Sequence, residues 1–190
     1  MASDTILTTD KRTRLIEAAV RLVYQRGFGR TSLADIAKEA GVALGNVYYY
    51  FKTKDEIGEA IIEQYLSLFR AAREQLGALD SARERLCSFV QMTVDTRRAI
   101  AERGCPLATL CSELRKETGP LARNAAQLFA EPLEWMEGQF RELGRGSEAR
   151  ELAVHLLAAL EGLAVLTHAL GDPELVLAET ERLQVWIRTL

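Results

Sequence analysis

The stretch TSLADIAKEAGVALGNVYYYFKTK, residues 31–54, decides how the first part of this chain folds. Ser32 is a residue type that caps helices, and Asp35 follows three positions later, where a capping box places its second side chain. Gly41 comes after the last apolar position of this short helix and predicts its end, because glycine tolerates the left-handed backbone in which helices commonly close. A second short helix is predicted over residues 44–51. Two short helices joined by a tight turn are typical of a helix-turn-helix.

The second of these helices carries three tyrosines and a phenylalanine in a row. At helical spacing, Val47, Tyr50 and Phe51 share one face and are predicted to pack inward. The other side presents Gly45, Asn46, Tyr48, Tyr49 and Lys52. A tyrosine hydroxyl can donate to phosphate and an asparagine amide can read a base edge, so this outer side is suited to DNA. For Tyr50, contact with DNA is the alternative to this packing role.

Charge is distributed unevenly along the chain. Up to Lys54 there are nine Lys/Arg and five Asp/Glu, a net charge of +4, whereas the remaining residues carry 15 and 22, a net charge of −7. The whole chain is therefore slightly acidic, at −3, although its first part is basic. A basic head on an acidic body indicates a local site for a polyanion.

The 190 residues are predicted to form an all-α protein of about nine helices, because helical periodicity recurs along the chain and no period-two strand pattern appears. We predict a disordered tail over residues 1–10, a three-helix head with the helix-turn-helix over 11–53, and a larger helical body over 54–190. Two of the helices predicted in the body run over residues 81–102 and 121–143.

Several classes of function find no support in the sequence. It has no phosphate-binding loop, nucleophile elbow, metal-ligand quartet or dinucleotide fingerprint, so we expect no enzyme activity, cofactor or metal. His155 and His168 are about 20 Å apart by helical rise and cannot share a metal ion within one chain. Three cysteines without metal spacing indicate reduced thiols in a cytosolic protein. We find no apolar signal region and no stretch of about 18 uncharged apolar residues, so we expect no membrane partner.

The segment TRLIEAAVRLVYQRGFGRTSLADIAKEAGVALGNVYYYFKTKDEIGEAII resembles the N-terminal domain of TetR-family (tetracycline-repressor-like) transcriptional regulators. The resemblance covers residues 11–62, about a quarter of the chain. It rests on the order and spacing of the elements Gly-Phe, Thr-Ser, Asp-Ile-Ala, Ala-Gly-Val and Tyr-x-Tyr-Phe-Lys-x-Lys. The stretch GCPLATLCSEL, residues 104–114, is similar to a segment in the ligand-binding domains of some members.

The resemblance implies a role for each residue of a DNA interface. Phosphate contacts at the start of the first short helix would come from Thr31 and Ser32. Bases would be faced by Gly45, Asn46 and Tyr48, and the DNA backbone would be held by Tyr49, Tyr50 and Lys54, with Lys52 nearby.

Two positions depart from the family's pattern. Ala43 stands where many members have serine, so the second short helix lacks its usual side-chain cap. Leu44 stands where many have lysine or arginine, which removes one polar contact, and Leu44 could instead touch a thymine methyl group. Both departures bear on which operator is recognised.

The resemblance also implies a homodimer whose body holds an effector pocket and whose last two long helices pair in the interface. The helix ARELAVHLLAALEGLAVLTHAL, residues 149–170, supports this independently, because its apolar residues wrap more than a narrow stripe. The dimer-interface candidates are Leu152, Leu156, Leu160, Leu163, Leu183 and Trp186. The pocket candidates are Phe89, Met92, Cys105, Leu110, Gln127, Trp135 and His155.

We therefore predict a cytoplasmic, ligand-responsive repressor that binds a palindromic double-stranded DNA operator as a homodimer and is released by a small-molecule effector. One alternative is a regulator that binds DNA without an effector. Another is a thiol-based redox or electrophile sensor, because Cys105 precedes Pro106 at a predicted helix start, where the helix dipole favours a thiolate. A third is a helical ligand-binding protein or enzyme whose head no longer binds DNA.

Overall fold

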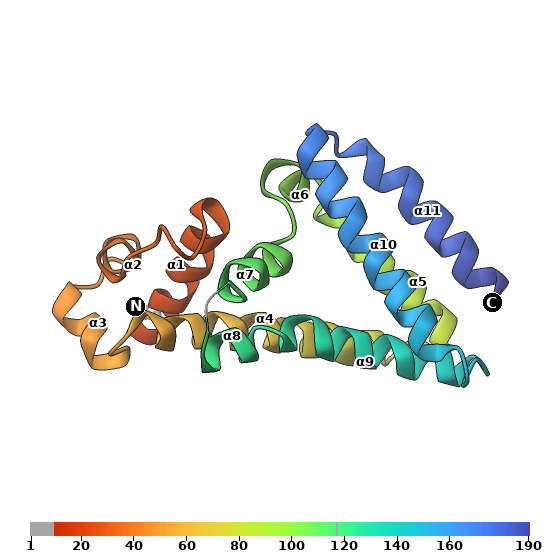
Figure 1. The fold of residues 1–190 in the computed structure, drawn as a ribbon, viewed down its shortest axis with the longest axis horizontal. Helices are drawn as coiled ribbons and strands as arrows, with labels where there is room; N and C mark the ends of the chain where they lie inside the picture. The colour runs from red at the N-terminus through yellow and green to blue at the C-terminus, as the bar shows by residue number, and fades with distance from the viewer. Residues whose placement is uncertain (1–9, 117) are drawn as a thin grey trace, which may run out of the picture. The chain divides into compact units, whose positions relative to one another are not determined.

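The structure is a computed structural model that describes residues 10–116 and 118–190, so the predicted tail lies outside the described residues apart from Asp10. Within these ranges every regular element is an α-helix, which confirms the predicted all-α class (Figure 1). The helices are α1 (Lys11–Arg26), α2 (Leu33–Ala40), α3 (Leu44–Tyr50), α4 (Lys54–Leu76), α5 (Ala82–Asp95), α6 (Arg97–Arg103), α7 (Pro106–Leu114), α8 (Pro120–Asn124), α9 (Gln127–Glu142), α10 (Ala149–Leu170) and α11 (Glu174–Thr189).

The described residues form eleven helices where about nine were predicted, because two predicted helices are each divided in two. Between α5 and α6, the hydroxyl of Thr96 donates back to the carbonyls of Met92 and Thr93, both at 3.3 Å, and such bonds compete with the helical ladder. Between α8 and α9, the hydrogen bonds tighten to three-residue steps, as from Phe129 N–H to Ala126 O at 3.1 Å. Periodicity continues through both breaks, so the sequence pattern hides them.

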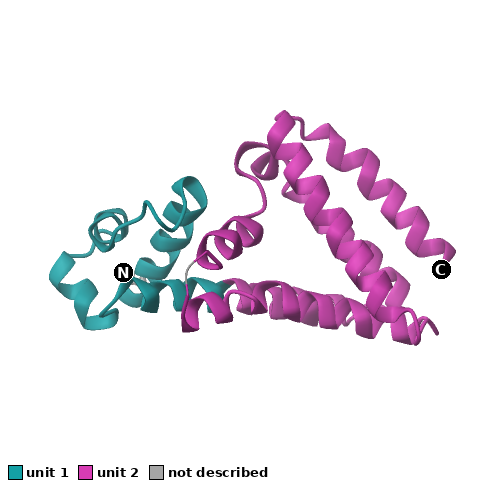
Figure 2. Cartoon of the chain, viewed as in Figure 1, with its two compact units in different colours: residues 1–64 teal, residues 65–190 magenta. Residues whose placement is uncertain are grey.

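The chain divides into two compact units, residues 1–64 and 65–190 (Figure 2). We call the described part of the first unit the head and that of the second the body. The boundary predicted between residues 53 and 54 falls at the start of α4, whereas the two units divide inside that helix.

The head packs α1 against α2 and α2 against α3. Each of its helices contributes fully buried apolar side chains, among them Leu15, Ile36, Val47, Ile57 and Ile61. Because α3 has only seven residues, Val47 and the following Phe51 are enough to fix which of its sides faces inward.

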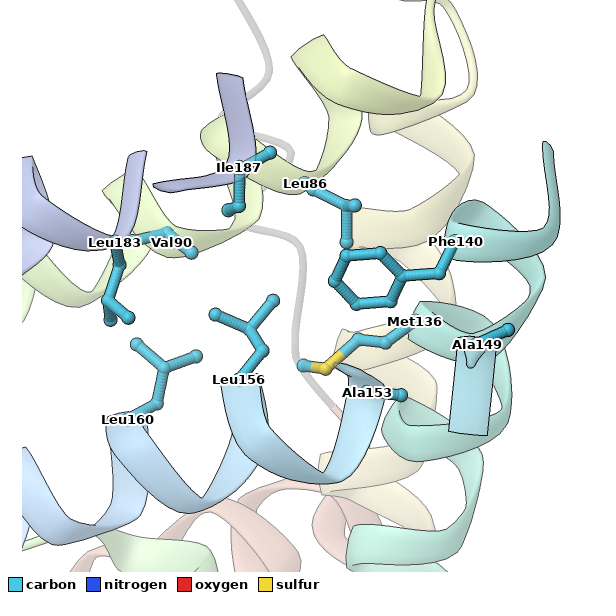
Figure 3. Packing of buried hydrophobic residues seen from close by; sticks show 10 residues of the cluster. All are labelled: Leu86, Val90, Met136, Phe140, Ala149, Ala153, Leu156, Leu160, Leu183 and Ile187. Carbon is cyan, nitrogen blue, oxygen red and sulfur yellow. The ribbon is translucent and has the colours of Figure 1, made fainter. Parts of the chain in front are cut away.

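The core of the body lies where α5, α9, α10 and α11 meet (Figure 3). Its buried side chains are Leu86 and Val90 of α5, Met136 and Phe140 of α9, Ala149, Ala153, Leu156 and Leu160 of α10, and Leu183 and Ile187 of α11. Figure 3 shows Leu156 pointing into the space that these helices enclose. One face of α10 therefore belongs to the interior of its own protomer.

This packing corrects the predicted dimer interface. Leu156, Leu160, Leu163 and Leu183 are at most 7 % exposed within a single chain, so they cannot present a face to a second copy. The two remaining candidates, Leu152 and Trp186, are partly buried and pack against the same core. The prediction was wrong for the four leucines, because apolar periodicity marks a buried face without telling which chain buries it.

α10 and α11 also expose apolar side chains on their outer sides. By length and composition α10 could cross a membrane, and a helix from the core of a folded domain passes the same test. In α10, 33 % of the most apolar window is buried, and this buried part packs in the core of the body. The exposed large apolar residues of the two helices are Val154, Val165, Leu166 and Leu170 of α10, and Leu177 and Val185 of α11.

Candidate nucleic-acid interface

The start of α2 is fixed by the capping box that the sequence predicts. The hydroxyl oxygen of Ser32 accepts a hydrogen bond from the backbone N–H of Asp35 at 3.1 Å, and the N–H of Ser32 donates to Asp35 Oδ2 at 3.0 Å. Arg26 of α1 lies 2.8 Å from the same carboxylate. The hydrogen bonds from Ser32, followed by the charge of Arg26, lower the pKa of Asp35 from 3.8 to about 2.

The turn after α2 fixes where α3 begins. Gly41 has a φ of 63°, and its N–H donates to the carbonyl of Lys38 at 3.2 Å. The N–H of Val42 donates to Ala37 O at 2.9 Å, which completes the two-bond pattern of a Schellman motif. α3 then starts at Leu44 without a side-chain cap, as the alanine at position 43 predicts.

The two sides of α3 differ as the sequence predicts. Val47 and Phe51 are 0 % and 3 % exposed, whereas Tyr48 and Tyr49 are 48 % and 77 % exposed. Tyr50 is half-buried, and its ring meets that of Tyr49 edge-on with centroids 5.0 Å apart. The exposed side also carries Gly45 and Asn46. No acidic residue occurs in α3, so a polyanion can approach this side without repulsion from the helix itself.

A shallow hollow of about 400 Å³ lies beside this exposed side of α3. It is lined by Gly29, Arg30, Thr31, Ser32, Leu33, Ala34, Leu44, Tyr48 and Lys54. The lining combines two cations, hydroxyl groups and the first turn of α2, and it contains no acidic residue. Cations are among the groups that proteins use to hold a DNA phosphate, whereas the hydroxyl groups of Thr31 and Ser32 donate within the head, to Gly27 O and to Asp35 Oδ2.

The lysines of this surface are held in place by the head. Lys54 Nζ donates to the carbonyl of Gly29 at 3.0 Å and lies 4.6 Å from the ring centroid of Phe28, within cation–π range. Lys52 Nζ donates to the carbonyl of Tyr48 at 2.5 Å. Both ammonium groups therefore have defined positions beside α3.

The surroundings of Thr31 do not fit the phosphate contact that the resemblance implies. Its side chain is 1 % exposed, and its hydroxyl donates to the carbonyl of Gly27 at 2.8 Å. Its backbone N–H donates to Phe28 O at 3.1 Å. Both donors of Thr31 are therefore used inside the head, and we withdraw it as a phosphate contact. Arg30, which sequence reasoning missed, lines the hollow and is exposed, and its place directly before Thr31 could have suggested it.

The predicted pocket residues of the body lie in different surroundings. Phe89 and Trp135 contact each other, with ring centroids 5.2 Å apart. The remaining apolar and polar candidates range from the fully buried Leu110 to Met92, which is 42 % exposed, and to the exposed Gln127. The ring of His155 lies 4.9 Å from that of Trp186. In the described part of the chain, no three His, Cys, Asp or Glu side chains gather closely enough to hold a metal ion.

Cys105 lies at the start of α7, as predicted, and its sulfur accepts a hydrogen bond from the backbone N–H of Ala108 at 3.5 Å. It does not have the predicted thiolate character. Burial, followed by the nearby carboxylate of Glu161, raises the pKa of Cys105 to about 12. These effects outweigh the helix dipole, so the thiol stays protonated, and the prediction of a low-pKa sensor thiol was wrong.

Comparison with known proteins agrees with the geometry of both units. Residues 15–61 match the family model of bacterial regulatory proteins of the tetR family. Residues 82–180, just over half of the chain, match that of the LmrA/YxaF-like transcriptional regulator C-terminal domain. The chain belongs to the TetR family of transcriptional regulators.

Individual relatives resemble either part of the sequence or the whole fold. A probable HTH-type transcriptional regulator, ArpR of Pseudomonas putida, is 35 % identical over 95 residues, which cover 46 % of this chain and 45 % of that protein. A TetR transcriptional regulator from Legionella pneumophila superposes with a TM-score of 0.82 at 19 % identity, covering 95 % and 97 % of the two chains. FadR of Bacillus subtilis, solved in complex with stearoyl-CoA, superposes with a TM-score of 0.71 at 20 % identity, covering 92 % and 96 %. The curated relative thus matches over less than half of its length, and the two structures show the fold alone.

Proposed function

We propose that this chain is a cytoplasmic, homodimeric repressor that binds a palindromic operator and is released from it by a small-molecule effector. The observation that carries the proposal is the exposed side of α3, where Asn46, Tyr48 and Tyr49 stand beside a hollow bordered by Arg30 and Lys54. A helix with uncommitted polar side chains next to a phosphate-binding surface is what reading a duplex requires. We propose no catalytic role for the chain.

The side chains of this surface divide into two proposed groups. Asn46 and Tyr48, next to Gly45, read base edges, and Leu44 is placed to touch a thymine methyl group. Phosphate is held by Arg30, Lys52, Lys54, Tyr49 and Tyr50. Ser32 is left out for the same reason as Thr31, because its hydroxyl and its backbone N–H both donate to Asp35 Oδ2, at 2.5 Å and 3.0 Å. The first group sets which operator is preferred, and the second sets how strongly any duplex is bound.

The proposed dimer forms through the outer side of α10 with α11 beside it. Val154, Ala158, Gly162, Leu166 and Leu170 recur at every fourth position of α10, and all are exposed. Such a row forms a ridge that can pack against the same ridge of a second copy, and the small residues in its middle allow a close approach. We therefore propose that a second copy of this chain packs on this ridge of α10 and on the exposed Leu177 and Val185 of α11.

The proposed release follows from two arrangements of the dimer, of which one spaces the heads for the operator. An effector shifts this equilibrium only by its difference in affinity for the two arrangements. A coupling free energy of about 1.4 kcal/mol lowers operator affinity tenfold. FadR, a relative by fold, has been solved with stearoyl-CoA, which supports a ligand-binding role for a body of this kind.

The test begins with selection of genomic duplex fragments by the purified protein. The proposal predicts a palindromic site that binds one dimer, with an affinity that falls steeply with salt because several phosphates are contacted. Compounds that raise the melting temperature of the body are then titrated against the complex, and at least one is expected to release the DNA. Operator binding that no such compound changes would favour the effector-independent regulator, and the absence of any enriched site would favour a helical ligand-binding protein.

A further inference from the structure

The body has a groove of about 400 Å³ that α7, α9 and α10 line together. Apolar contacts are offered by Ala108 of α7, Phe129 of α9 and Val165 of α10. Polar groups come from Ser112, from Arg115 at the end of α7, and from Glu161 of α10. This mixture of apolar walls with a few polar groups is that of a small-molecule site.

Glu161 lines this groove, and one of its carboxylate oxygens has no hydrogen-bond donor in the described part of the chain. Oε1 accepts a hydrogen bond from the thiol of Cys105 at 3.4 Å. Oε2 is buried and has no hydrogen-bond partner among the described residues. No basic side chain of the described chain forms an ion pair with this carboxyl group, and burial raises its pKa. A buried carboxylate oxygen without a donor is unfavourable, and each such group in a folded protein calls for an explanation.

The chemistry of the missing partner follows from what Oε2 lacks. An oxygen that only accepts requires an N–H or O–H donor, and a desolvated carboxylate is stabilised most by a positive charge. The terminal torsion of a glutamate side chain is soft, so a donor in the groove can meet this oxygen after a small rotation. Arg115 lines the same groove but is exposed, so solvent screens its charge.

We propose that this groove binds a small apolar molecule that carries a protonated amine, with Glu161 accepting a hydrogen bond from the ammonium group. The ring of Phe129 and the side chain of Val165 would contact its apolar part. The inference rests on the proposed function only in taking the bound amine to be the effector, because the binding itself can be measured without DNA. The thiol of Cys105 acts here as a neutral donor that orients the carboxylate.

The test compares amines with a neutral alcohol by isothermal titration calorimetry with the full-length protein. The probes are the primary amine 4-phenylbutylamine, its secondary and cyclic amine analogues, and 4-phenylbutan-1-ol, the neutral alcohol that matches the primary amine in shape. The best amine is expected to bind at least about tenfold more tightly than the alcohol, because charge-assisted hydrogen bonds are the stronger ones. Glu161→Gln keeps the shape of the side chain and is expected to remove this preference. Glu151→Gln, an exposed acid on the same helix, is the matched control and should retain it.

Each outcome decides the proposal. A preference for the amine that Glu161→Gln removes and Glu151→Gln retains supports it. Equal binding of amine and alcohol to the wild-type protein, or no binding of any amine at 10 mM probe, overturns it without reference to a variant. A preference that survives Glu161→Gln also overturns it. If the amine binds as expected but does not change operator affinity, the site stands and its role as the effector site fails; if no operator exists, only the proposed function fails.

Discussion

Replacing Gly45 by alanine distinguishes an effect on DNA binding from an effect on the stability of the head. Gly45 is the second residue of α3 and is exposed, and apart from its chain neighbours and the nearby backbone of its own helix, no heavy atom lies within 4 Å of the position that a Cβ atom would occupy. Its φ is not positive, so alanine adopts the same backbone without strain. Since alanine favours helix by up to about 1 kcal/mol over glycine, the free energy of unfolding of the head should stay unchanged or rise.

The same methyl group is expected to weaken operator binding. If Gly45 lets the backbone of α3 approach the bases, the added Cβ stands between them, and a cost of about 1.4 kcal/mol per head is a tenfold loss. A dimer carries two heads, so the loss should be about a hundredfold. Fluorescence anisotropy on the selected operator measures the affinity, and circular dichroism melting measures stability.

Gly138→Ala is the matched control, because Gly138 also lies inside a helix, α9, with open space where its Cβ would be. It should leave operator affinity unchanged. Wild-type affinity for Gly45→Ala would refute the close approach of α3 to the bases. A lowered melting temperature would contradict the open space around Gly45.

Four further predictions concern phosphate contact, the core, the cap and the dimer. Lys54→Ala should weaken binding to all duplexes alike and lower the slope of log K against log salt by about 1.8, since a dimer loses two phosphate contacts; an unchanged slope would remove Lys54 from the interface. Leu156→Ala should lower the free energy of unfolding by about 2–5 kcal/mol in urea denaturation, because the side chain is fully buried in the core of the body. Because the pKa of Asp35 is lowered, its cap stabilises the head fully above the unfolded pKa near 3.8 and loses this contribution as the pH falls towards 2. In Asp35→Asn, the melting temperature of the head should therefore depend less on pH over that range. Leu166→Glu should shift the protein from dimer to monomer in analytical ultracentrifugation while its melting remains cooperative, and an unchanged dimer would place the interface elsewhere.

Local signals in the head could be interpreted from the sequence because each depends on a few neighbouring residues. The capping box of Ser32 and Asp35 and the left-handed Gly41 use contacts within one turn. The inward side of α3 follows from the spacing of Val47 and Phe51. By contrast, the commitment of the Thr31 hydroxyl to Gly27 O depends on the shape of the loop before α2, which no residue pattern specifies.

The body was harder to predict because its helices have more than one apolar side. α10 buries Leu156 and Leu160 in its own core and exposes Val154 and Leu166, and both sides look alike in the sequence. The surroundings of Glu161 were missed for a related reason, since Cys105 approaches it from 56 residues away in the chain. Only the packing of α7 against its neighbours reveals that this carboxylate is buried.

Parallel selections with wild-type protein and Asn46→Ala test whether the exposed side of α3 reads the operator. Asn46 is exposed, and the structure gives it no side-chain bond within the head, so its loss should not affect folding. Both proteins should select palindromic sites, and the variant should lose or change its preference at the same base pair in each half-site. Identical selected motifs at equal affinity would show that base recognition lies outside this side of α3.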